Sequence, residues 1–206
     1  MQLSFRRFPF LLAALCFASA PILSRAQLPA LVSPPTSFAA RVSLNGVHNA
    51  GKITDRLFRG AQPSPSALPQ LKALGITTIV DLRRGSPQTS EDERHLAESL
   101  GLRFVHIPVG GFSTPSSEQL ARFFSLLRET PPQTIFVHCH YGEDRTGVFI
   151  ASYRIAFQHW PAEQALAEMR AFGFNSFWHP GMITFVRQLP ARLQSDPTLR
   201  TALSAP

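Results

Sequence analysis

Short apolar runs alternate with longer amphipathic segments along the chain from residue 57 onward. The run at 76–82 is rich in β-branched residues and follows Gly75, which is typical of a buried strand. Leu120, Phe123 and Leu127 repeat instead at helical spacing and indicate the apolar face of a helix. This alternation predicts an α/β domain with a central, largely parallel sheet of four to five strands flanked by helices. The predicted strands are residues 57–60, 76–82, 102–108 and 134–137.

Capping and breaking residues predict where the helices begin and end. Ser90 with Glu93 matches a capping box, and Gly101 ends the same helix. Thr114 and Pro115 precede the amphipathic segment and predict its start, while Pro180 suits the first turn of a later helix. The predicted helices are residues 63–74, 90–100, 114–128, 148–158, 161–171 and 180–193.

The N-terminal residues are typical of a secretory signal peptide at 1–26. Arg6 and Arg7 precede an apolar stretch, and Ser24-Arg25-Ala26 forms a cleavage site before Gln27. An uncleaved membrane anchor is the alternative, although prolines interrupt the stretch. We therefore expect an exported protein, periplasmic or secreted, with no stable membrane span after cleavage. The predicted parts that follow the leader are a linker or N-terminal arm at 27–50, a catalytic domain at 51–194 and a frayed tail at 195–206.

Composition narrows the class of ligand. A chain of 206 residues with 44% hydrophobic residues can bury a core. Its formal net charge of +7 favours anionic ligands; the alternative is a basic surface that contacts only solvent. No basic run carries interleaved aromatic residues, which argues against nucleic acid. The seven histidines lack ligand spacing, so we expect no metal and no cofactor. We expect a monomer.

One segment concentrates the candidate chemistry, the run from His138 to Gly147. A cysteine at the end of a strand, five residues, an arginine and then a helix is the arrangement that a thiolate needs to attack a phosphate ester. Loop amides and the helix N-terminus bind the anion, the same field stabilises the thiolate, and Arg145 offers a planar fork to two phosphate oxygens. Since Cys16 leaves with the leader, Cys139 would be the single cysteine of the mature chain.

At these residues the chain resembles the cysteine-dependent protein tyrosine and dual-specificity phosphatases, whose signature is His-Cys, five residues, Arg, then Ser or Thr. Residues 57–64 and 74–83 are similar to the N-terminal half of the compact atypical members, and the resemblance extends to about residue 174. It implies a dual-specificity-phosphatase-like fold and a phosphocysteine intermediate on Cys139, with Thr146 assisting the departure of the sulfur. The predicted substrate-binding residues are His140, Tyr141, Gly142, Glu143, Asp144 and Arg145, and His138 is expected to orient the loop.

The chain departs from the family's pattern at the position of the general acid. Typical members carry an Asp roughly thirty residues before the cysteine, whereas residues 108–113 contain no carboxylate. Asp144, at a position where the lipid-directed myotubularin relatives also carry Asp, is the first candidate and Glu143 the second; a purely structural carboxylate is the alternative. Asp81, at the end of a predicted strand, is expected to tie down that strand or Arg83. The aromatic segment 171–178 is expected to pack the end of the fold or to line the rim of the site.

Three functions fit this pattern. The first is a phosphoric monoester hydrolase for phosphotyrosine, phosphoserine or phosphothreonine proteins, or for phosphoinositides or inositol phosphates. A non-catalytic protein that binds phosphorylated ligands is the second, because the upstream carboxylate is missing. A rhodanese-like sulfurtransferase is the third and is disfavoured by Thr146-Gly147 after Arg145.

Overall fold

The computed structural model describes residue 2, residues 37–85 and residues 87–204. The predicted signal peptide and residues 27–36 of the predicted linker lie outside these residues. The described residues from 37 onward fall within one compact unit, so the folded part begins before and ends after the predicted boundaries of 51 and 194. Among the described residues, no helix combines the length and apolar character that a membrane span requires.

A mixed sheet of six strands forms the centre of this unit, in the order β1-β2-β3-β6-β4-β5. Four neighbouring strands are parallel, as predicted, and β4 and β6 are buried along their whole length, which explains their continuous apolar runs. Two further strands pair antiparallel at the β3 edge. The strands are β1 (Ala40–Arg41), β2 (Gly51–Thr54), β3 (Leu57–Gly60), β4 (Thr78–Arg83), β5 (Arg103–Val109) and β6 (Ile135–His138).

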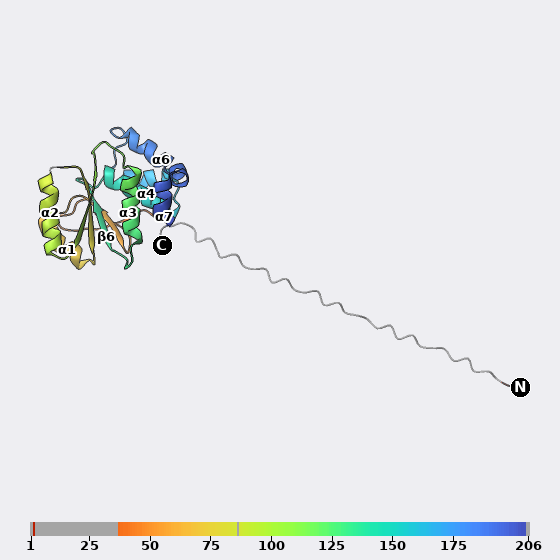
Figure 1. The fold of residues 1–206 in the computed structure, drawn as a ribbon, viewed down its shortest axis with the longest axis horizontal. Helices are drawn as coiled ribbons and strands as arrows, with labels where there is room; N and C mark the ends of the chain where they lie inside the picture. The colour runs from red at the N-terminus through yellow and green to blue at the C-terminus, as the bar shows by residue number, and fades with distance from the viewer. Residues whose placement is uncertain (1, 3–36, 86, 205–206) are drawn as a thin grey trace. The chain divides into compact units, whose positions relative to one another are not determined.

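Helices cover both faces of the sheet (Figure 1). The 3-10 turn η1 (Pro65–Ala67), α1 (Leu68–Ala73) and α2 (Pro87–Ser99) lie on one face, where Leu68 and Leu71 pack with Ile79 and Phe136. The larger apolar cluster lies on the other face, where helices supply buried residues such as Phe123 and Phe149. These helices are α3 (Ser117–Arg128), α4 (Asp144–Gln158), α5 (Ala162–Ala171), α6 (Pro180–Ser195) and α7 (Pro197–Ser204).

Three predictions about the chain's segments are corrected. The helix expected from residue 114 begins at Ser117, because Ser116 is its N-cap and forms a capping box with Gln119. The tail expected to fray contains α7, which buries Leu199 and Ala202 in the larger apolar cluster. Residues 40–41, expected in a linker or N-terminal arm, belong instead to the sheet, where they pair with β2 as β1.

Candidate active site

The predicted phosphate-binding loop lies at the carboxyl end of β6, between the central strand and α4. Cys139 follows the last residue of β6 and is buried, with a free thiol. α4 begins at Asp144, so Arg145, Thr146 and Gly147 lie in its first turn. The helix N-terminus has no capping hydrogen bond from its N-cap residue, Glu143, which leaves its first amides available to an anion.

Gly142 makes the tight turn of this loop possible. Its φ of +73° lies in the left-handed region, and a Cβ there would lie 2.5 Å from the backbone nitrogen of Ala61 and the carbonyl carbon of Gly60. The loop therefore rests directly on the backbone that follows β3. The amide of Gln62 also donates to the carbonyl of His140, at 3.1 Å.

Two side chains that the sequence did not single out hold the carbonyl of Gly142. Arg59, in β3, donates from Nη2 at 2.5 Å, and Asn49 donates from Nδ2 at 3.0 Å. Asn49 also donates to the carbonyl of Phe172 at 2.8 Å, and the guanidinium of Arg59 lies 4.0 Å from the centre of the Phe172 ring. An arginine within the otherwise apolar run 57–60 was the available signal for Arg59; nothing in the local sequence pointed to Asn49.

Behind the cysteine, His138 is fully buried between the loop and α2. Its Nδ1 lies 3.2 Å from the carbonyl oxygen of Cys139, and its Nε2 lies 2.9 Å from Oε1 of Glu93 as an ion pair. Burial lowers the pKa of His138, but the nearby negative charge of Glu93 outweighs this, so the pKa is raised above its ordinary value. The imidazolium form is thereby favoured directly behind the loop.

Glu93 belongs to a buried polar network rather than to a capping box. Arg83 donates to both oxygens of Asp81, at 2.8 and 2.9 Å, and to Glu93 at 2.6 Å. Ser90 donates to Asp81 at 2.8 Å. The predicted capping box is wrong because both of its side chains turn toward the end of β4, whereas the prediction that Asp81 ties down Arg83 is confirmed.

The candidate general acid, Asp144, has a partner from a distant segment. Its Oδ2 lies 3.4 Å from Nε2 of His179, and Oδ1 is buried without a hydrogen bond to any described residue. His179 is stacked with Phe112, at 5.1 Å between ring centres, and contacts Phe174. His179, the N-cap residue of α6, was missed because only the fold brings it to the loop.

The remaining predicted residues divide between the loop's interior and its rim. Thr146 is fully buried, and its hydroxyl has no hydrogen-bond partner among the described residues. Arg145 donates from Nη1 to the carbonyl of Val109 at 3.3 Å. His140, Tyr141 and Glu143 line a cavity of about 500 Å³ beside the loop, together with Asn49, Gln62 and other residues of 46–65.

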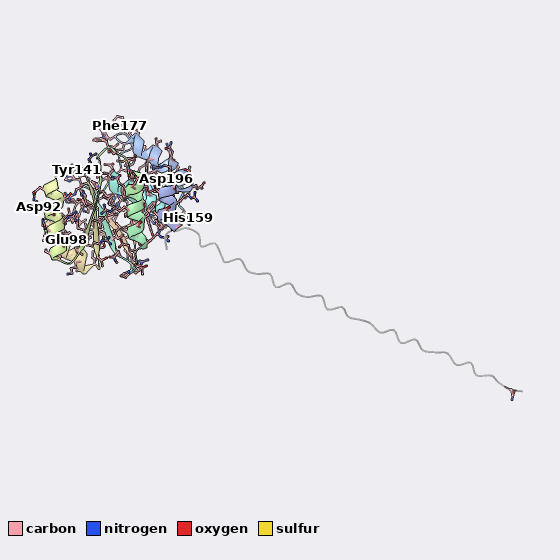
Figure 2. The ribbon with its side chains drawn as sticks, in the orientation of Figure 1. Asp92, Glu98, Tyr141, His159, Phe177 and Asp196 are labelled. Atoms are coloured by element: carbon pink, nitrogen blue, oxygen red, sulfur yellow. The ribbon has the colours of Figure 1, made fainter. Side chains whose placement is uncertain are left out.

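Exposed aromatic side chains surround this end of the domain. Tyr141, Phe112, Phe177 and Trp178 are among the six large hydrophobic residues that are exposed in the described chain. Figure 2 shows Tyr141 and Phe177 toward one end of the domain and Glu98 toward the other. In the segment 171–178, Phe172 and Phe174 are buried, which confirms that it packs the end of the fold, and Phe177 and Trp178 are exposed.

Comparison with known families identifies the protein's relatives. Residues 39–181 match the family described as "DSP-PTPase phosphatase fused to NAD+ Kinase". The chain belongs to this family of dual-specificity-phosphatase-like proteins. The match contains every strand from β1 to β6 and the whole loop from Cys139 to Thr146.

Individual relatives support the same membership. The dual specificity protein phosphatase TpbA of Pseudomonas aeruginosa strain PAO1 is 28% identical over 153 residues, which are 74% of this chain and 66% of that protein. For TpbA of strain UCBPP-PA14, the match covers 56% of the relative, so this chain spans between half and two thirds of the TpbA proteins. The catalytic core of the PP-IP phosphatase SIW14 from S. cerevisiae has the same fold, with a TM-score of 0.60 at 20% identity over 76% of this chain and 98% of that one.

Proposed function

We propose that the protein is a phosphoric monoester hydrolase that acts through a phosphocysteine intermediate. The observation that supports this most directly is the loop itself. The buried thiol of Cys139 directly follows the central strand, and Arg145 and Thr146 lie in the first turn of α4. The side chain of this helix's N-cap residue forms no capping hydrogen bond. Family membership favours phosphate chemistry over the sulfurtransferase alternative.

In the first step, the thiolate of Cys139 attacks phosphorus, and the bond between phosphorus and the ester oxygen breaks. The loop amides and Arg145 stabilise the charge that develops on the three non-bridging oxygens. Asp144 gives its proton to the leaving oxygen. In the second step, water attacks the phosphocysteine and loses a proton to the same carboxylate, and the sulfur leaves as a thiolate that accepts a hydrogen bond from Thr146.

We propose phosphorylated proteins and phosphorylated inositols or phosphoinositides as the substrate classes. TpbA is named as a dual specificity protein phosphatase and SIW14 as a PP-IP phosphatase, so the names of relatives cover both classes. The rim of His140, Tyr141 and Glu143 would contact the part of the substrate beyond its phosphate.

The decisive experiment compares phosphate release by the wild-type protein and Cys139→Ser. We expect the wild type to release phosphate from p-nitrophenyl phosphate and from members of a panel of phosphopeptides, inositol phosphates and lipids, and the serine variant to be inactive because its hydroxyl is a poor nucleophile. Equal release by the two proteins would overturn the proposal.

A second function has one observation in its favour. Residues 108–113, where the family's general acid is expected, contain no carboxylate, which suits a protein that binds phosphorylated ligands without turnover. Phosphate binding by both proteins without release by either would establish this alternative.

A further inference from the structure

The carbonyl of Gly142 is a critical group in the candidate phosphate loop. An anion is bound by the loop's amides, so a carbonyl oxygen that turned toward the anion would repel it. The oxygen of Gly142 is held by two donors, Nη2 of Arg59 and Nδ2 of Asn49, which approach it from residues outside the loop. Their hydrogen bonds oppose rotation of the peptide between Gly142 and Glu143.

Arg59 carries its charge at a buried position, where the guanidinium loses its hydration. Its side chain is completely buried in β3, and Nε and Nη1 have no hydrogen-bond partner in the described part of the chain. Burial lowers the pKa of Arg59 to about 10, although the charges of Glu168 and Cys139 oppose this. The face of Phe172 compensates for part of the lost hydration. Since an apolar side chain would fill this space at a lower cost, the role of the cation lies in its contact with the loop.

Asn49 is itself held in place by its backbone conformation and by hydrogen bonds. Its φ of +54° is a left-handed conformation that Asn tolerates better than most residues. Its Nδ2 bridges the carbonyls of Gly142 and Phe172, while its Oδ1 accepts a hydrogen bond from Nη1 of Arg41 at 2.9 Å. Both polar atoms of the side chain, Oδ1 and Nδ2, therefore have hydrogen-bond partners.

We propose that Arg59 and Asn49 are positioning residues that keep the carbonyl of Gly142 turned away from the phosphate and so preserve the loop's anion-binding conformation. As far as it concerns catalysis, this inference rests on the proposed function. It also predicts anion binding, which can be measured without turnover.

The matched variants are Asn49→Asp and Asn45→Asp. Asn49→Asp keeps the shape, the backbone preference and the bond to Arg41, but it places a carboxylate oxygen against two carbonyl oxygens. Asn45→Asp makes the same chemical change at an exposed residue of the same segment, whose side chain has no hydrogen bond to another described residue. Because hydrogen bonds of this kind hold the loop, we expect kcat/KM on p-nitrophenyl phosphate to fall roughly tenfold to a hundredfold in Asn49→Asp and to stay unchanged in Asn45→Asp.

Neutral variants separate the lost donor from the added charge. Asn49→Gly suits the positive φ and leaves no carboxylate, and it should show the same loss in kcat/KM. Arg59→Met keeps the volume and removes the charge, whereas Arg59→Lys retains a donor and should recover part of the activity. Equal activity of Arg59→Met and the wild type, or of Asn49→Gly and the wild type, would overturn the inference.

The binding measurement distinguishes this inference from the proposed function. The affinity for inorganic phosphate is measured by calorimetry, first in Cys139→Ser. It is then measured in three double variants that combine Cys139→Ser with Asn49→Gly, Arg59→Met or Arg59→Lys. Thermal unfolding verifies that each variant is folded. We expect affinity to fall roughly tenfold or more in the first two combinations and to recover partly in the third. Loss of binding in these combinations, together with a wild type that releases no phosphate, would leave the inference supported and the hydrolase proposal refuted. Unchanged affinity in folded variants would refute the inference even if the wild type is an active phosphatase.

Discussion

Two carboxylates at the start of α4, Glu143 and Asp144, differ in their surroundings although they are adjacent in the chain. Asp144 faces His179, at 3.4 Å, whereas Glu143 lies against Gly173, where an added Cβ would come within 2.9 Å of its Oε1. Burial, followed by the charge of Asp144, raises the pKa of Glu143, and Arg59 opposes this effect. A raised pKa favours the protonated form that a general acid requires, so Glu143 remains the second candidate.

The leaving group of the substrate separates these two carboxylates. Asp144→Asn should lower kcat about a hundredfold or more on an alkyl phosphate, whose leaving oxygen needs a proton, and only mildly on p-nitrophenyl phosphate, whose leaving group does not. Glu143→Gln serves as the matched control and should affect both substrates mildly. Equal mild losses in Asp144→Asn, or a larger difference between the substrates in Glu143→Gln, would refute the role of Asp144.

At the scale of elements, β4, α2 and β6 are joined by buried charges instead of by apolar packing alone. Asp81 at the end of β4 binds Arg83 and Ser90, and Arg83 binds Glu93 of α2, which in turn contacts His138 of β6. Burial raises the pKa of Asp81, but the hydrogen bond from Arg83 and the nearby charge of His138 outweigh this and lower it from 3.8 to about 2. The network therefore contributes stability that depends on pH.

Acid should weaken this network in a predictable window. A lowered carboxyl pKa gives stability that is fully present above the unfolded value, near pH 4, and is lost as the pH falls through the folded value, near pH 2. The difference in free energy of unfolding between the wild type and Asp81→Asn should shrink by about 2 kcal/mol between pH 5 and pH 2, as measured by urea titration. Asp92→Asn, an exposed substitution on α2, should show no such change. A difference for Asp81→Asn that is constant with pH would contradict this assignment.

At the scale of the whole molecule, the N-terminal segment of the folded unit reaches the candidate phosphate loop. Within residues 39–49, Ala40–Arg41 pair with β2 as β1, and Asn49 donates to the carbonyl of Gly142. The amide of Ala39 donates to Glu168 of α5 through a hydrogen bond of 2.6 Å. The folded unit therefore includes residues 39–49 of the segment that the sequence predicted as a linker or N-terminal arm. We propose that this unit works outside the cytoplasm as an exported protein.

Export can be tested on the intact chain. When the protein is expressed in a Gram-negative host, we expect to recover it from the periplasmic fraction. Its intact mass should equal that of a chain that begins at Gln27, because the apolar stretch before Ser24-Arg25-Ala26 directs cleavage there. The denatured mature protein should then contain one titratable thiol, Cys139. Recovery of the full-length chain in the membrane fraction would favour the uncleaved anchor instead.

The sequence predicted those parts of the site that are local in the chain. Cys139, Gly142, Arg145 and Thr146 lie within eight residues, so their spacing alone indicates a strand, a tight loop and a helix. One misinterpretation, the capping box at Ser90, involves residues whose partners are distant. Ser90 and Glu93 have the spacing of a capping box, but α2 begins earlier, at Pro87, so Ser90 lies inside the helix. Both side chains bind the buried Asp81 and Arg83, since buried charges need partners.

By itself, the sequence determined the α/β class, the parallel central strands and the strand, loop and helix that carry Cys139 and Arg145, because periodicity and local spacing encode these features within short stretches of chain. Only the tertiary structure decided that Arg59 and Asn49 hold Gly142, that His179 faces Asp144 and that Glu93 lies behind the cysteine. These contacts join segments up to 93 residues apart. They depend on strand order and helix packing, which no local pattern of hydrophobic and polar residues specifies.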